Sequence, residues 1–77
     1  MGEIQSSTIQ ILAEFSKKRP TELTSLTPIE SLGLDSLDTL EAMMKLEEAF
    51  NIEIDTARFS MCGTIGDVLA EINRVSQ

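Results

Sequence analysis

The sequence predicts a small all-α protein: a four-helix bundle with three principal helices, one short helix and a long first loop. The chain has 77 residues, which is too short to bury two separate cores, so residues 1–77 should form a single domain. Apolar residues recur at helical spacing in three segments, and no segment carries the sustained alternation of a strand. The only short alternation, in 51–55, is too brief to build a sheet.

The first helix is expected over residues 2–19, where one face is apolar. That face consists of Ile4, Thr8, Ile11, Leu12 and Phe15. The basic run 17–19 would lie in the last turn, at the negative end of the helix dipole, and Pro20 would end the helix.

Residues 21–35 form the long connection, rich in Thr, Ser, Pro and Gly. It holds five large aliphatic residues, Leu23, Leu26, Ile29, Leu32 and Leu34. Because these are too many for a solvated linker, we expect the segment to pack across the helices. Connections of this length in compact domains are often functional.

The second helix should run from Ser36 to Phe50, with Asp35 or Ser36 as its N-cap. Asp55 can cap a short third helix over 56–61 that is closed by Gly63. The fourth helix begins after Thr64, which has the capping-box spacing to Asp67. Its apolar face consists of Ile65, Val68, Leu69, Ile72 and Val75.

The second helix carries two apolar stripes. The wider one, predicted to face the core, holds Ala42, Met43, Leu46, Ala49 and Phe50. A separate, narrower stripe, which we call the ridge, holds Leu37, Leu40 and Met44, and its acidic rim holds Glu41, Glu47 and Glu48. Two interpretations are open at this point: the bundle surrounds the helix and the ridge is more core, or the ridge is a docking surface.

The net charge of the chain limits the classes of molecule that it can bind. Thirteen acidic residues face six basic ones, for a net charge of −7, and residues 35–55 hold seven of the acids and a single base. This field repels a phosphate backbone, and three Phe are the only aromatic residues, so nucleic acid is not expected as a partner. The same field attracts basic protein surfaces.

Catalysis by the chain itself is not expected. Without histidine there is no Ser-His-Asp or Cys-His pair and no imidazole metal ligand, so we predict neither an enzyme nor a metal site.

Cys62 is the lone cysteine; it indicates a reducing compartment such as the cytoplasm, and we assign it no function. No apolar run exceeds three residues, which argues against a membrane span or a signal peptide.

Ser36 lies where the connection becomes the second helix. A serine in this position is most often only a helix cap. Here it is part of the run LGLDSLDTLE at 32–41, followed by KLEEAF at 45–50 and TIGDV at 64–68. With these motifs the chain resembles the acyl carrier protein family over essentially its full length.

The resemblance implies a cofactor and a set of partners. Ser36, flanked by Asp35, would carry 4′-phosphopantetheine, transferred from coenzyme A by a phosphopantetheinyl transferase that supplies Mg²⁺ and the general base. Acyl transferases and synthases with basic patches would dock on Leu37, Asp38, Leu40, Glu41, Met44, Glu47 and Glu48. An acyl chain would be sheltered by Ala42, Met43, Leu46 and Ile72. The carrier is expected to be a monomer.

Two functions of different classes follow. The first is an acyl carrier protein that delivers thioester-bound intermediates to fatty acid, lipid or polyketide biosynthesis enzymes. The second is an unmodified acidic adaptor that binds a partner through the ridge. Lys45 and Arg58 depart from the acidic surface of the family, which fits a specialised carrier at least as well as the carrier of general fatty acid synthesis.

Overall fold

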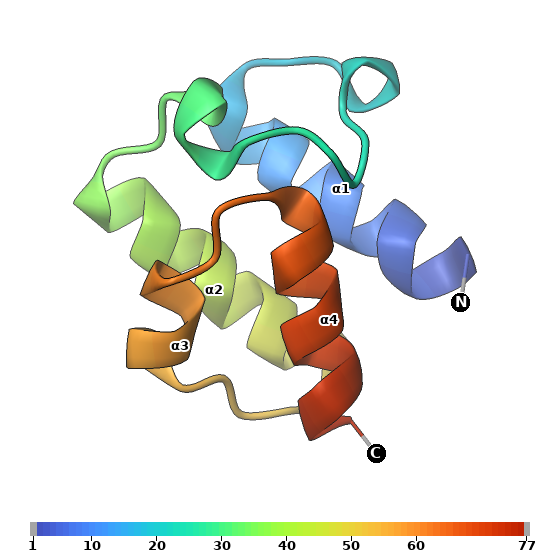
Figure 1. The fold of residues 1–77 in the computed structure, drawn as a ribbon, viewed down its shortest axis with the longest axis vertical. Helices are drawn as coiled ribbons and strands as arrows, with labels where there is room; N and C mark the ends of the chain where they lie inside the picture. Colours follow the sequence, from blue (N-terminus) through green and yellow to red (C-terminus); the bar gives the residue numbers. More distant parts are fainter. Residues whose placement is uncertain (1, 77) are drawn as a thin grey trace.

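The computed structural model describes residues 2–76 and confirms the all-α bundle. In the described residues there are four α-helices, two short 3₁₀ helices and no strand (Figure 1). In chain order the elements are α1 (Gly2–Ser16), η1 (Pro20–Glu22), η2 (Ile29–Leu32), α2 (Ser36–Phe50), α3 (Thr56–Ser60) and α4 (Ile65–Val75). None of the described helices is both long and apolar enough to span a bilayer.

The core consists of two packed clusters. One joins α1 and the long connection to the buried faces of α2 and α4, and contains Leu12, Ala13, Leu23, Leu32, Ala42 and Ile65. The other joins α2, α3 and α4 and contains Met43, Leu46, Ile54, Phe59, Val68 and Ile72. Burial of these apolar side chains supplies most of the folding free energy.

The first helix ends earlier than predicted. It stops at Ser16, and Lys17 adopts a left-handed conformation with φ of 65°. The Ser16 hydroxyl accepts a hydrogen bond from the backbone N–H of Lys18 at 3.2 Å, which favours the turn over another helical residue. The basic run therefore follows the helix and is not part of its last turn.

The long connection is ordered and tied to the start of α4, near the top of the view in Figure 1. The backbone N–H groups of Ile65 and Gly66 donate to the carbonyls of Thr27 and Ser25, at 3.0 and 2.8 Å. Leu23 and Leu32 are buried, as expected for a segment packed on the helices. The expectation was wrong for Leu26, which is 83% exposed at a turn.

The second helix has the predicted bounds, and most of its predicted core face is inside. Ala42, Met43 and Leu46 are buried and Phe50 is half-buried. Ala49, however, is exposed, because it borders an open hollow against α1 that is lined by small and polar side chains such as Ser7 and Gln10.

The caps of the two last helices were predicted correctly at their starts. The Asp55 carboxylate accepts from the N–H of Ala57 at 2.8 Å, and Thr64 and Asp67 form the reciprocal capping box. Backbone N–H groups of Gly63 and Thr64 hold the pKa of Asp67 below its usual range. The end of α3 differs from the prediction, because Met61, in a right-handed conformation, is its C-cap in place of Gly63.

Candidate functional site at the start of α2

Ser36 is the first residue of α2 and is exposed to solvent. Asp35 is the N-cap: its Oδ1 accepts from the N–H of Asp38 at 2.7 Å, and its carbonyl accepts from the N–H of Thr39 at 2.9 Å. Within the described part of the chain, the Ser36 hydroxyl has no hydrogen-bond partner. The structure thus assigns capping to Asp35 and leaves the Ser36 Oγ available for chemistry.

The residues before Ser36 hold the start of α2 in place. Gly33 ends η2 in a left-handed conformation with φ of 69°, which a side chain would strain. Leu32 on one side of this glycine is 2% exposed, and Leu34 on the other is half-buried against the first core cluster. The turn that presents Ser36 is therefore held in place by a packed leucine on each side of Gly33.

The site fits a phosphodiester on the Ser36 oxygen. The N–H groups of Ser36 and Leu37 at the helix start lack an acceptor within residues 2–76 and lie at the positive end of the helix dipole. These groups favour an anion there and partly offset the carboxylates of Asp35 and Asp38. The residues present thus offer a hydroxyl for the attachment and N–H groups that partly compensate the negative charge of the predicted cofactor.

The ridge lies on the surface. Leu37, Leu40 and Met44 are 63%, 44% and 55% exposed, so the interpretation of the ridge as additional core is wrong. An exposed apolar stripe of this kind is typical of the centre of a protein interface.

The acidic rim is not uniform. Glu41 and Glu48 are exposed, and Asp38 is half-buried. Glu47 is also half-buried, and its Oε2 accepts from the backbone N–H of Ile54 at 2.7 Å. The carboxylate of Glu47 therefore fastens the α2–α3 connection, a contact that the sequence pattern did not reveal.

Both basic departures from the acidic surface are paired with acids of the same chain. The Lys45 Nζ lies 3.7 Å from the Glu14 carboxylate on α1, and the Arg58 Nε lies 3.2 Å from the Glu71 carboxylate on α4. The ridge is thus less affected by these two cations than the sequence suggested, because each is directed toward another helix.

A hollow of about 330 Å³ opens near the start of α2. It is lined by Leu34 and Thr39, two and three residues from Ser36 in the chain, and by Phe59 and Val68 of α3 and α4. The residues predicted for the acyl cavity, Ala42, Met43, Leu46 and Ile72, are buried in the core and do not line this hollow. Val68 connects the two, because it borders the hollow and packs in the cluster that contains Met43, Leu46 and Ile72.

Comparison with known proteins decides the family. The family described as "Phosphopantetheine attachment site" matches residues 7–72, which include α2 and Ser36. The chain belongs to this family.

Relatives of this phosphopantetheine attachment family share substantial identity with the chain. An acyl carrier protein of Wolinella succinogenes is 50% identical over 44 residues, which cover 57% of this chain and 58% of the relative. One of a Sulfurovum species is 45% identical over 47 residues, 61% of this chain and 63% of the relative. Acyl carrier protein 2, chloroplastic, of Arabidopsis thaliana is 37% identical over 62 residues, 80% of this chain and 46% of the relative. The matches thus span about half to three fifths of these relatives' lengths.

Proposed function

We propose that the chain is an acyl carrier protein whose Ser36 bears 4′-phosphopantetheine. The observation that carries the proposal is the exposed Ser36 hydroxyl, which has no hydrogen-bond partner among residues 2–76, while Asp35 caps the helix. Membership of the phosphopantetheine attachment family supports it. When attached, the arm supplies a thiol on which acyl groups are held as thioesters.

The chain takes part in loading as a substrate. The Ser36 Oγ attacks the β-phosphorus of coenzyme A; the Oγ–P bond forms, the P–O bond to the α-phosphate breaks, and 3′,5′-ADP leaves. The hydroxyl proton passes to a base of the transferase, since this chain has no histidine. The chain contributes an anchored hydroxyl and the helix N–H groups beside the new phosphodiester.

The ridge is proposed as the docking surface for the transferase and for acyl transferases and synthases of fatty acid, lipid or polyketide biosynthesis. Its apolar centre supplies binding free energy, and the exposed carboxylates of Glu41 and Glu48 attract basic patches. Asp38 and Glu47, also assigned to this surface, are half-buried. We expect the carrier to act as a monomer in a reducing compartment such as the cytoplasm.

An acyl chain is proposed to enter the hollow beside Thr39 and to reach the core residues behind Val68. The inner end of this path would be formed by Ala42, Met43, Leu46 and Ile72. Met43 suits a space that fills and empties, because an unbranched thioether side chain adapts its shape readily.

The test is in vitro loading. The chain is incubated with coenzyme A, Mg²⁺ and a broad-range phosphopantetheinyl transferase, and its intact mass is measured. We expect the gain of one phosphopantetheinyl group, its loss in Ser36→Ala, and its retention in the matched control Ser31→Ala, which removes another exposed serine hydroxyl. A wild-type chain that gains no mass, or a Ser36→Ala chain that still does, would contradict the proposal.

The exposure of the ridge also favours a second function, an unmodified adaptor that holds a partner through Leu37, Leu40 and Met44. The adaptor would bind its partner equally well with Ser36→Ala and would lose it with Met44→Glu. A carrier would instead lose loading in both variants, through the missing hydroxyl in one and through weaker docking in the other.

A further inference from the structure

The segment 55–62, which contains α3, lies between two residues whose backbone groups are hydrogen-bonded to other parts of the bundle, Ile54 and Gly63. Before it, the N–H of Ile54 is held by the Glu47 carboxylate of α2 at 2.7 Å. After it, the carbonyl of Gly63 accepts from the N–H of Ile29 in the long connection at 2.9 Å. The segment between these points is short, and its helix has only five residues.

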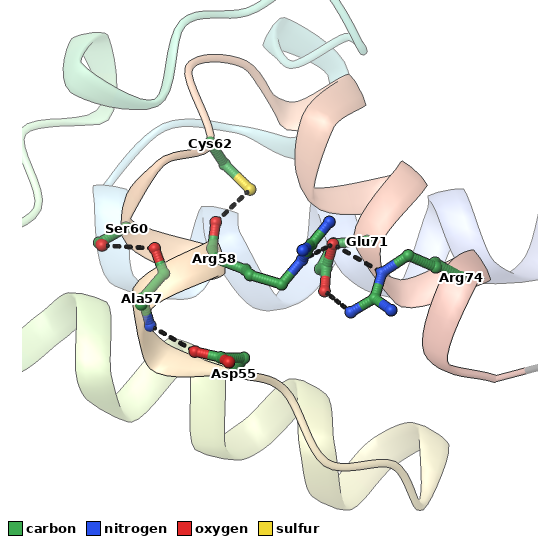
Figure 2. A network of polar contacts seen from close by, with 7 residues as sticks. All are labelled: Asp55, Ala57, Arg58, Ser60, Cys62, Glu71 and Arg74. Carbon is green, nitrogen blue, oxygen red and sulfur yellow. Dashed lines mark hydrogen bonds and ion pairs between the residues drawn. The ribbon is translucent and has the colours of Figure 1, made fainter.

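Phe59 and Arg58 hold this segment onto the bundle, and Cys62 also packs against the second core cluster. Phe59 is 6% exposed in the second core cluster. Arg58 reaches from α3 to the Glu71 carboxylate of α4, with 3.2 Å between Nε and Oε1, and Figure 2 shows Arg74 approaching the same carboxylate from its own helix. Glu71 is 8% exposed, while the side chains of both arginines are about half exposed.

Separating Arg58 from Glu71 costs little free energy, because the same carboxylate also binds Arg74. A buried carboxylate that loses its partner is strongly destabilising. Here Glu71 keeps Arg74 when Arg58 leaves, so no buried charge is left unpaired. The half-exposed guanidinium of Arg58 returns to water easily, and dissolved salt screens its attraction to Glu71.

We propose that the Arg58–Glu71 ion pair is a salt-sensitive latch that sets how often segment 55–62 lifts from α4. The lifting widens the hollow of about 330 Å³, because Phe59, Ser60 and Cys62 form part of its wall. The use of this motion, to admit and release cargo next to Ser36, rests on the proposed carrier function. The latch itself does not depend on the cofactor.

The accessibility of the Cys62 thiol can be used to measure how often segment 55–62 lifts from α4. Cys62 is half-buried at the end of the segment, and its Sγ donates to the Arg58 carbonyl at 3.5 Å. The experiment measures alkylation of Cys62 by iodoacetamide, a neutral reagent, in the Ser36→Ala chain, where no arm thiol can compete. Peptide mapping by mass spectrometry confirms the alkylated residue.

Arg58→Gln should raise the alkylation rate by about three-fold, the order expected for loss of an ion pair with one half-exposed partner. The change in thiol acidity acts in the opposite direction. Burial raises the pKa of the Cys62 thiol and the Arg58 charge partly lowers it, so removal of that charge alone would slow alkylation.

Arg74→Gln is the matched control, because it removes the other guanidinium from the same carboxylate. It leaves Arg58 as the arginine that pairs with Glu71, so opening would cost this carboxylate its ion pair and alkylation should fall below the wild-type rate. A structural role without a latch predicts instead that both substitutions loosen the segment and raise the rate.

Salt supplies the second readout. Between about 0.01 M and about 1 M NaCl the Debye length falls from roughly 30 Å to roughly 3 Å. The Cys62 rate should rise with salt when Arg58 is present and stay nearly constant in Arg58→Gln, and amide hydrogen exchange of α3 in the same chains should follow. Equal responses of the two arginine variants, or a salt dependence that survives Arg58→Gln, would overturn the latch. Neither result bears on loading of Ser36, which is measured separately.

Discussion

Substitution of two adjacent methionines, Met43 and Met44, distinguishes effects on folding from effects on docking. Met43 is 5% exposed in the second core cluster, whereas Met44, one residue later, is 55% exposed on the ridge. Replacing each by alanine removes the same atoms from the core in one variant and from the surface in the other. The two variants therefore control for each other in chemistry and in helix propensity.

The structure sets the expected magnitudes. Met43→Ala should lower the free energy of unfolding by about 2–5 kcal/mol, the range for methionine lost from a core. A domain of this length has a total of roughly 4–12 kcal/mol, so this variant should be markedly less stable. Met44→Ala should change stability by less than about 0.5 kcal/mol. Because complete burial of a methionine is worth about 1.5–3 kcal/mol and Met44 is half exposed, its loss should weaken docking by about 1 kcal/mol, or roughly five-fold.

Urea denaturation followed by circular dichroism measures the stabilities. Docking is measured as kcat/KM of the phosphopantetheinyl transferase for each carrier at concentrations well below KM, where the value reports the encounter of the two proteins. Destabilisation of the fold by more than about 1 kcal/mol in Met44→Ala would contradict a surface position for this side chain. Loading of Met44→Ala as efficient as that of the wild-type chain would contradict its part in docking.

Three further predictions concern buried and capping groups. Thr8→Val should raise the free energy of unfolding in urea by about 1 kcal/mol, because the buried Thr8 Oγ1 has no hydrogen-bond partner in the described residues; a loss of stability would contradict this. Asp35→Ala should cost about 1 kcal/mol in the same assay, and Ser36→Ala less than about 0.5 kcal/mol; the reverse order would show that Ser36 is the cap. Hydrogen bonds from Arg74 first, and then from Arg58, hold the pKa of Glu71 below its usual range, so the stability it contributes is present above about pH 4.5 and is lost as the pH falls through the lowered value in the fold. The urea midpoint of Glu71→Gln should consequently fall less steeply with acid than that of the wild-type chain, and parallel curves would exclude this role.

The local signals in the sequence were sufficient for most helix boundaries. The bounds of α2 and the Thr64–Asp67 box were predicted because capping depends on residues close in the chain. The end of α1 was not, because the basic run and Pro20 gave a plausible later stop, while the chain turns at Lys17. Exposure of Ala49 was missed since a helical wheel shows the direction of a side chain but not the size of the residues that face it.

For the candidate site, too, the sequence predicted what depends on residues close in the chain and missed contacts between elements. Periodicity within one helix placed Leu37, Leu40 and Met44 on one stripe but left open whether that stripe is core or surface, and the structure shows that it is exposed. The contact of Glu47 with the Ile54 N–H and the bridge from Arg58 to Glu71 join different elements, so no spacing rule indicates them. The hollow beside Thr39 likewise depends on how α3, α4 and the long connection meet.

The mass of the chain purified from its native cells shows whether the Ser36 hydroxyl at the start of α2 carries the arm. Intact mass with fragmentation of the peptide that contains Ser36 should show one phosphopantetheinyl group on that residue, in part of the molecules extended by an acyl group. A native chain with an unmodified Ser36 in every molecule, or with the group on another residue, would contradict the account.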